Sequence, residues 1–261
     1  MAGEDESMKK LIVANWKMDP QTYREAERLA RAVSKTAERH KNVKVVLCPP
    51  FVWLTDLSHR RPRGVEYGAQ DTFWESKGPF TGEVSPAMLK KSGVEYVIIG
   101  HSERRRWLNE TDEMVNKKVL AALKAGLKVI LCVGEPFVVR KRGTAAVLRH
   151  VRRQLAHAVK NIPKEKRGRI VIAYEPIWAI STSDVGIPCS PFEAERMVRA
   201  CAAYLANKEN FRDVRGIYGG SVNARDVKSY LDMEYIDGAL VGAASLKAAE
   251  FKKIIKVASL I

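Results

Sequence analysis

The stretch Ile170-Val171-Ile172-Ala173-Tyr174-Glu175-Pro176 is the part of this chain that most clearly indicates its fold. Five apolar residues in succession are typical of a short parallel strand that is covered on both faces. The strand ends in Glu175, and Pro176 opens an apolar segment that runs to Ile180. A carboxylate shielded from water contributes little to stability, but it is well suited to removing a proton from carbon.

Similar apolar runs recur along the chain and alternate with amphipathic helical segments. Eight such units in about 250 residues predict an α/β fold, a single-domain (β/α)8 barrel over residues 9–261. An open doubly wound sheet is the alternative, but no Gly-x-Gly-x-x-Gly motif follows the first run. The predicted strands are Leu11–Ala14, Val43–Leu47, Glu66–Ala69, Tyr96–Ile99, Lys128–Val133, Ile170–Tyr174, Gly216–Tyr218 and Gly238–Val241.

Composition suits a reduced, cytoplasmic protein. Of the 261 residues 46% are hydrophobic, and no apolar run reaches the roughly 18 residues of a membrane span. Residues 1–8 are polar and acidic, and we expect them to form a flexible tail, because a secretory signal would need a basic start and an apolar centre. The four cysteines form no Cys-x-x-Cys pair, and five histidines lack metal-ligand spacing, so we expect no metal.

The chain is strongly basic, with 45 lysines and arginines against 30 acidic residues and a net charge of +15. Such a charge attracts anions of every kind, from small phosphates to nucleic acid. No interleaved aromatic residues of the kind used by single-strand binders accompany the basic clusters. Nucleic-acid binding therefore has no support in the sequence beyond net charge.

Polar or small residues follow five of the predicted strands, where the side chains of a barrel converge on one face. They are Asn15 and Lys17, His101 to Glu103, Glu175, Gly219 to Ser221, and Gly242 with Ala243. Taken singly, each has an ordinary structural explanation. Cys132, which ends the fifth strand, is expected in the core rather than in catalysis. The placement of one functional group at each strand end is what favours an active site.

These residue types suit isomerisation of a small phosphorylated sugar. Glu175 would remove a proton from carbon, and His101 would donate a hydrogen bond to the neighbouring oxygen as charge develops there. Lys17 would neutralise negative charge. The small-residue turns would present backbone N–H groups to a phosphate. The expected reaction is an aldose–ketose exchange through an enediolate.

Five blocks of the chain resemble the triosephosphate isomerase family, and the resemblance extends from Leu11 to the last predicted helix. The blocks are Ala14-Asn15-Trp16-Lys17-Met18, Gly100-His101-Ser102-Glu103-Arg104-Arg105, Ala173-Tyr174-Glu175-Pro176-Ile177-Trp178-Ala179-Ile180, Tyr218-Gly219-Gly220-Ser221-Val222 and Leu240-Val241-Gly242. The resemblance implies a glycolytic and gluconeogenic isomerase that interconverts D-glyceraldehyde 3-phosphate and dihydroxyacetone phosphate without metal or organic cofactor. This enzyme is a standard example of a glutamate base, a neutral histidine and loop closure.

The resemblance also implies residue roles. Glu175, His101 and Lys17 would be catalytic, and Asn15 would line the substrate site beside Lys17. Glu103, Ser102 and Cys132 would contact these catalytic residues without touching the substrate. Backbone N–H groups would hold the phosphate at Ser181, Ser221, Gly242 and Ala243. The lid would comprise Pro176, Ile177, Trp178, Ala179, Ile180, Ser181, Thr182 and Ser183.

The long connection after the third predicted strand carries three aromatic residues, Phe73, Trp74 and Phe80. In the family, the segment that resembles Gly78 to Glu83 inserts into a second subunit. The resemblance therefore implies a homodimer, with an interface that contains Phe80, Thr81, Glu83 and Arg104. Contacts of the aromatic residues within their own subunit are the alternative.

The lid departs from the family pattern, because serines replace both glycines of the usual Ile-Gly-Thr-Gly ending. Backbone donors survive at Ser181 and Ser183, but a positive φ there becomes costly. We expect an active enzyme whose turnover depends on the altered lid, and a change in kcat after Ser181→Gly and Ser183→Gly. Unchanged turnover in a steady-state assay would contradict this expectation.

Two other functions remain open on the sequence. One is a phosphate-binding or regulatory barrel in which the altered lid has abolished fast catalysis. The other is an interaction protein whose basic surface holds nucleic acid or an acidic partner. Retention of Lys17, His101 and Glu175 together disfavours the first, because a binding protein needs no carbon base.

Overall fold

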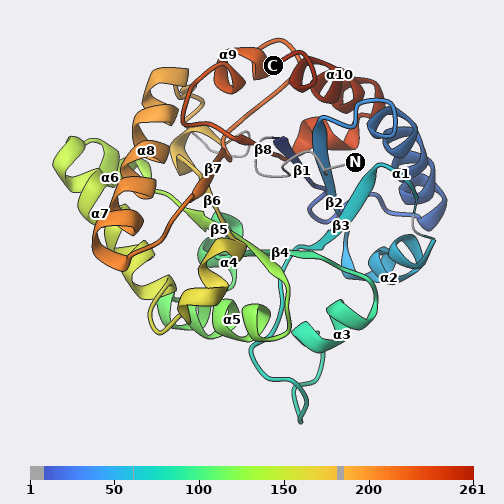
Figure 1. The fold of residues 1–261 in the computed structure, drawn as a ribbon, viewed down its shortest axis with the longest axis horizontal. Coiled ribbons are helices and arrows are strands. Elements are labelled where there is room, and N and C mark those ends of the chain that lie inside the picture. Colours follow the sequence, from blue (N-terminus) through green and yellow to red (C-terminus); the bar gives the residue numbers. More distant parts are fainter. Residues whose placement is uncertain (1–8, 61, 181–184) are drawn as a thin grey trace.

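The chain forms a closed barrel of eight parallel strands in sequence order (Figure 1). The computed structural model describes residues 9–60, 62–180 and 185–261, so the expected tail at residues 1–8 lies outside the described part. β1 pairs with β8 as well as with β2, which closes the ring and rules out the open sheet. The strands are β1 (Lys10–Asn15), β2 (Val43–Cys48), β3 (Val65–Ala69), β4 (Tyr96–Ile99), β5 (Lys128–Val133), β6 (Ile170–Tyr174), β7 (Arg215–Tyr218) and β8 (Gly238–Val241).

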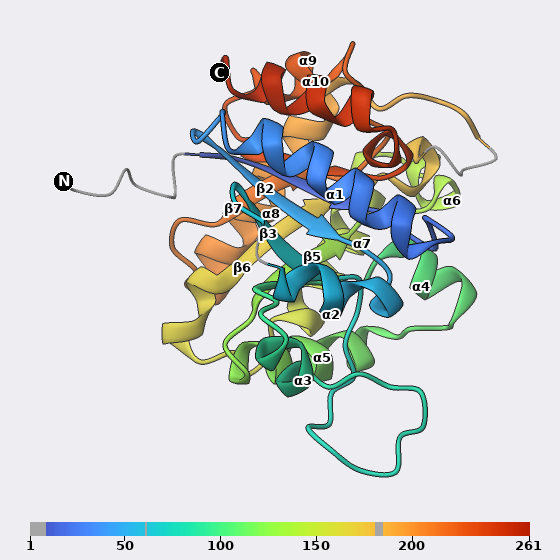
Figure 2. The same cartoon turned by 90° about the vertical axis from the view of Figure 1, so that its right-hand side faces the viewer.

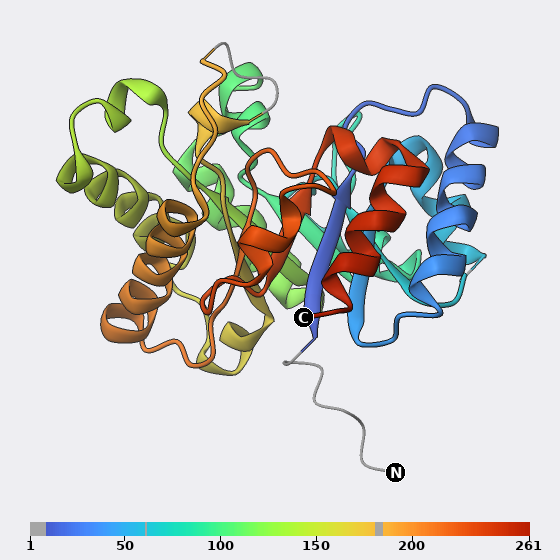
Figure 3. The same cartoon turned by 90° about the horizontal axis from the view of Figure 1, so that it is seen from above.

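Helices surround the barrel on its outer side (Figures 1 and 3). The α-helices are α1 (Tyr23–Ala37), α2 (Phe51–His59), α3 (Pro86–Lys91), α4 (Ser102–Trp107), α5 (Asp112–Lys124), α6 (Phe137–Arg140), α7 (Thr144–Ala158), α8 (Pro191–Glu209), α9 (Val227–Leu231) and α10 (Ala248–Ala258). Three short 3₁₀ helices complete the described elements: η1 (Lys164–Arg169), η2 (Ile177–Ala179) and η3 (Ala243–Leu246). Among the described residues, no helix combines the length and apolarity that crossing a bilayer would need.

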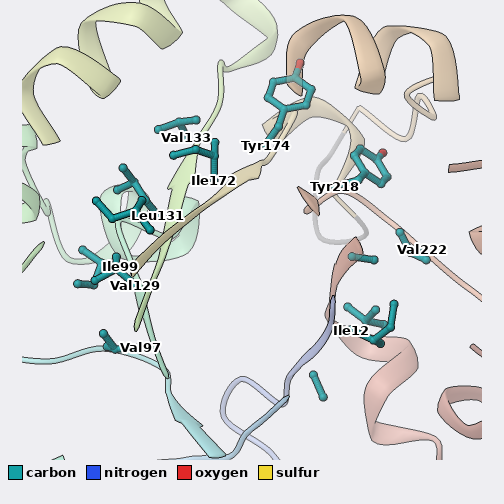
Figure 4. Packing of buried hydrophobic residues seen from close by; sticks show 14 of the residues in the cluster. Ile12, Val97, Ile99, Val129, Leu131, Val133, Ile172, Tyr174, Tyr218 and Val222 are labelled. Carbon is teal, nitrogen blue, oxygen red and sulfur yellow. The ribbon is translucent and has the colours of Figure 1, made fainter. Parts of the chain in front are cut away.

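Each strand is buried on both faces, which explains its nearly continuous apolar sequence. In β5, Ile130 and Cys132 belong to a cluster inside the barrel. Val129, Leu131 and Val133 alternate with them and pack against the surrounding helices (Figure 4). Alternate residues of each strand therefore pack into two separate apolar layers, one inside the barrel and one between the barrel and the helices.

The stretch Ser190-Pro191-Phe192-Glu193 predicts a helix start with a capping box, and the structure confirms it. Ser190 accepts the backbone N–H of Glu193, and Pro191 occupies the first helical position of α8. The sequence carries no signal for α4 and α6, because both are too short to show a helical period. The connection at residues 70–85 projects from the molecule as a long loop before α3 (Figure 2).

Candidate active site

Lys17 lies two residues beyond the end of β1, in a left-handed backbone conformation with φ of 56°. That conformation is uncommon for a residue with a side chain and needs local support. Asn15 Oδ1 accepts the backbone N–H of Lys17 at 3.0 Å, and Gln70 Nε2 donates to its carbonyl at 2.8 Å. The Lys17 Nζ atom donates to Glu103 Oε1 at 2.6 Å. The ammonium group is thereby anchored at the mouth of the barrel.

His101 follows β4 and caps the short helix α4. Its Nδ1 atom accepts the backbone N–H of Glu103 at 3.2 Å. A ring nitrogen that accepts a hydrogen bond carries no proton, so this geometry assigns the neutral ring with its proton on Nε2. Nε2 lies 3.2 Å from Glu175 Oε1. The Nε2 atom of the histidine therefore lies close to the carboxylate that we expect to act as the base.

Glu175 follows β6, and its side chain is only 2% exposed. Its Oε2 atom accepts the backbone N–H of Ser102 at 3.1 Å, whereas Oε1 has no aligned hydrogen-bond donor despite its distance from His101. Burial and the neighbouring Glu175 carboxylate raise the pKa of the Cys132 thiol well above its usual value. The carboxylate is thus shielded from water, and only one of its two oxygens accepts an aligned hydrogen bond. Both features suit a base.

A cavity of about 430 Å³ opens beside these groups. Its lining combines Asn15, Lys17 and His101 with the small-residue turns after β7 and β8. Those turns contribute Gly219, Gly220, Ser221, Gly242 and Ala243. The cavity therefore joins the predicted chemical groups to the predicted phosphate end. Glu175 does not line it and stands behind His101 and Gly219, so the carboxylate must turn to reach a ligand.

The segment that we expect to form the lid is described only as far as Ile180; Ser181, Thr182 and Ser183 lie outside the described residues. Within the described part, the Ala179 carbonyl accepts the backbone N–H of Ser221 at 3.2 Å. The Ser221 donor, which we expected to serve a phosphate, is therefore engaged by the lid in this structure. An anion that takes this N–H must first separate it from Ala179.

Glu135 is a buried carboxylate that the sequence analysis missed. It accepts the Tyr174 hydroxyl at 3.1 and 3.2 Å and the Trp178 indole Nε1 at 2.8 Å, and burial raises its pKa. Glu135 thus holds Trp178, in the first turn of the expected lid, to the barrel. The signal was present, because Glu135-Pro136 follows β5 as Glu175-Pro176 follows β6.

Gly219 lies against the expected base, so a small residue is required there. A Cβ atom there would lie 2.8 Å from Glu175 Cγ and 3.3 Å from the Tyr174 carbonyl oxygen. We expect Gly219→Ala to displace the carboxylate and lower kcat by roughly 10²-fold, as small misplacements of catalytic groups do. Gly168→Ala, where the added atom meets nothing within 4 Å, is the control for steady-state kinetics. Equal kcat in the two variants would contradict this role for Gly219.

The expected interface residues lie on and beside the projecting loop. Phe80, Thr81 and Glu83 are exposed. The three aromatic residues contact one another inside the loop, as the alternative expected, because Phe73 stacks on Trp74 at 4.0 Å and lies 4.7 Å from Phe80. Arg104, also expected at the interface, pairs within its own chain.

Four further cavity residues, Asn223, Arg225, Lys247 and Glu250, had no sequence signal that linked them to the site. They come from the segments that follow the small-residue turns after β7 and β8. No cluster of three or more histidine, cysteine or acidic side chains suited to a metal ion occurs in residues 9–60, 62–180 and 185–261.

Comparison with known proteins agrees with the geometry. The sequence model of the family described as triosephosphate isomerase matches residues 10–258. A triosephosphate isomerase of Caldanaerobacter subterraneus subsp. tengcongensis is 44% identical over 94% of this chain and 98% of its own. That of Acetivibrio thermocellus is 44% identical over 96% of this chain and 98% of its own.

A solved structure shows the same architecture. The crystal structure of triosephosphate isomerase from Bartonella henselae superposes with a TM-score of 0.82 at 31% sequence identity. The match covers 95% of this chain and 98% of that one. Family model, relatives and fold agree over nearly the whole length, and this chain belongs to the triosephosphate isomerase family.

Proposed function

We propose that this chain is a triosephosphate isomerase that interconverts D-glyceraldehyde 3-phosphate and dihydroxyacetone phosphate in glycolysis and gluconeogenesis. The presence of Lys17 and His101 in one cavity, with Glu175 beside His101, supports the proposal, above all the 3.2 Å between His101 Nε2 and Glu175 Oε1. A base and a hydrogen-bond donor at this separation can act on adjacent atoms of one small substrate.

The reaction needs one proton to move between two carbons. Glu175 leaves the Ser102 N–H, removes a proton from the carbon beside the carbonyl and becomes neutral. His101 donates through Nε2 to the oxygen on which negative charge develops, and the Lys17 ammonium neutralises the same charge. His101 gives its Nε2 proton to the former carbonyl oxygen and takes the hydroxyl proton from the adjacent carbon's oxygen, which becomes the new carbonyl. Glu175 returns its proton to the former carbonyl carbon, so that no atom is gained or lost. The buried site limits competition from water.

The phosphate end of the cavity would bind the substrate and couple its binding to the position of the lid. Backbone N–H groups of Ser221, Gly242 and Ala243 would bind the phosphate, with Ser181 as a further donor from the part of the lid outside the described residues. Because Ser221 is held by the Ala179 carbonyl, phosphate binding would exchange one partner of this N–H for another. Such an exchange couples lid position to substrate.

A coupled isomerase assay on the purified chain tests this function. We expect saturable turnover of D-glyceraldehyde 3-phosphate and incorporation of solvent deuterium into substrate carbon. The sequence alternative, a phosphate-binding barrel without fast catalysis, predicts phosphate binding in calorimetry with neither turnover nor exchange. That result would reject the proposed function.

We infer that the chain forms a homodimer through the projecting loop and its surroundings. Large apolar side chains are exposed in the segments after β1, β2, β3 and β4, which are neighbours in the barrel: Met18, Val52, Met88 and Trp107 are 57% to 88% exposed. Clustered exposed apolar side chains favour a protein contact. The Gly78–Glu83 tip, which is exposed throughout, would enter the partner subunit.

Thr81→Arg should convert the dimer to a monomer, because it introduces a charge at the tip of the inserted loop. Light scattering after size-exclusion chromatography measures the change. Ser229→Arg adds the same charge on α9, which lies across the barrel from the loop in Figure 1, and should leave the mass unchanged. A wild-type chain that is already monomeric would reject the inferred dimer.

We propose a cytoplasmic location. All four cysteines are buried and free, as in proteins of reducing compartments. Export of the native chain with intact activity would argue against this location.

A further inference from the structure

The floor of the barrel, opposite the active site, holds a cavity of about 920 Å³, twice as large as the catalytic one. Tyr96, Lys128 and Arg215 line it from the first residues of β4, β5 and β7, and Lys44 and Val171 line it from the second residues of β2 and β6. In parallel strands these starts lie at the end away from the catalytic residues.

Three of the strand residues that line this cavity are cations directed into the barrel. Lys44, Lys128 and Arg215 each stand two positions before an interior core residue, namely Val46, Ile130 and Ile217. Because side chains alternate along a strand, the cations point to the same interior. Barrel interiors are ordinarily filled by branched apolar side chains, so a cationic bottom layer needs a compensating role.

Four more cations surround the mouth of the cavity. Lys164, Arg167 and Arg169 come from η1, and Arg212 comes from the loop between α8 and β7. Seven cations therefore line the cavity with one carboxylate, that of Asp213. The positive excess persists when nearby acids are included.

Two such acids interact with these cations from outside the cavity lining. Glu66 pairs with Lys44 at 2.7 Å. Burial raises the pKa of Asp237, and the positive charges of Arg215 and Lys10 act against that rise. Concave sites with one sign of charge concentrate ions of the opposite sign. A compact ligand with several negative charges fits this excess better than a single phosphate does.

The aromatic faces in the cavity are already covered. Lys128 lies 5.1 Å from the Tyr96 ring centre, and Arg167 lies 5.1 Å from that of Phe211. A base or another planar group finds no stacking surface there, whereas single-strand binders rely on such surfaces. Recognition at this site would rest on charge.

We propose that the basic floor cavity is a second anion site, for a compact polyphosphate that carries several charges. It lies at the far end of the barrel from the isomerase site and does not depend on the proposed reaction. A ligand bound there would contact residues from β2, β4, β5, β6 and β7 and would tie five strand starts together. Its expected effect is higher resistance to unfolding.

Calorimetric titration of the full chain with tripolyphosphate tests the proposal. We expect saturable binding that is about tenfold or more tighter than binding of orthophosphate, because several charge-assisted contacts replace one. Lys164→Ala/Arg212→Ala, which removes two exposed cations of the rim, should weaken tripolyphosphate by about tenfold or more. Arg152→Ala/Arg153→Ala removes the same charge from exposed positions of α7 and should change the affinity by less than about twofold.

Two further variants separate this site from others. Lys17→Met removes the ammonium of the active-site cavity and should leave tripolyphosphate affinity unchanged. Lys128→Met alters the floor itself and should abolish tight binding, with folding verified by circular dichroism. Absence of saturable binding, equal weakening by the α7 control, or loss of affinity in Lys17→Met would overturn the proposal. Tighter binding of a single-stranded oligonucleotide than of tripolyphosphate would overturn it as well.

Discussion

Glu175→Gln should lower kcat by roughly 10²- to 10⁴-fold, the range that a positioned general base contributes. The amide keeps the shape of the side chain and can still lie beside Ser102, but it cannot accept a proton from carbon. KM should change little, since Glu175 does not line the cavity that receives the ligand. Steady-state kinetics gives both parameters. Solvent deuterium exchange into the substrate should fall in parallel with kcat.

Glu250→Gln is the matched control for this variant. Glu250 lines the same cavity, and its Oε1 atom accepts the backbone N–H of Ala224 at 2.7 Å. The substitution removes the same charge from the site but leaves the base in place, so kcat should stay within about threefold of the native value. If the Glu175 and Glu250 variants lose activity equally, or if Glu175→Gln remains fully active, Glu175 is not the base.

Lys118→Met should destabilise the protein by about 3–5 kcal/mol, the usual cost of removing one partner from a buried ion pair. Lys118 Nζ donates to both carboxylate oxygens of Asp71 and to Glu110 Oε2, each at 2.8 Å, and all three residues are buried. Burial raises the pKa of Asp71 to about 6 against the attraction of Lys118. Burial also acts to raise the pKa of Glu110, but the charges and hydrogen bonds of Lys118 and Arg104 together outweigh it and lower that pKa. In the variant, the charges of the two carboxylates would be neutralised by Arg104, which lies 2.8 Å from each of them, and no longer by Lys118.

Urea unfolding at a fixed protein concentration measures the difference. Lys117→Met, one residue earlier on α5, is the control, because Lys117 is 51% exposed and pairs with the exposed Glu113. Its effect should stay within about 1 kcal/mol. Adding Asp71→Asn to Lys118→Met should restore part of the lost stability, since one uncompensated charge disappears. Equal effects of the two lysine variants would show that this cluster is not a buried ion-pair network.

Local patterns in the sequence predicted the strands well. Tyr96–Ile99, Lys128–Val133, Ile170–Tyr174 and Gly238–Val241 occur within the predicted bounds, because a strand buried on both faces must be apolar throughout. The residue pattern predicts a helix over Ala224–Leu231, but α9 begins three residues later, at Val227. Residues 224–226 lie in a turn where Asn223 and Asp226 bond each other, and such side chains compete with helical hydrogen bonds.

Groups that depend on partners remote in sequence could not be predicted in the same way. Gln70 supports the backbone of Lys17 from 53 residues away, and Lys118 meets Asp71 from 47 residues away. Neither residue stands out in its own segment. Their roles exist only because the closed barrel brings β1, β3 and the helix after β4 together.

The order of apolar runs along the chain, and the polar group placed after each, was enough to determine an eightfold parallel barrel and a glutamate, a histidine and a lysine at one end of it. This followed because strand burial and strand direction are local consequences of residue pattern. Only the tertiary structure decided that the Glu175 carboxylate rests on the Ser102 N–H, that Glu135 holds the lid, and that cations gather on the barrel floor. Hydrogen bonds and charge excess depend on distances across the barrel, and these arise when the ring closes.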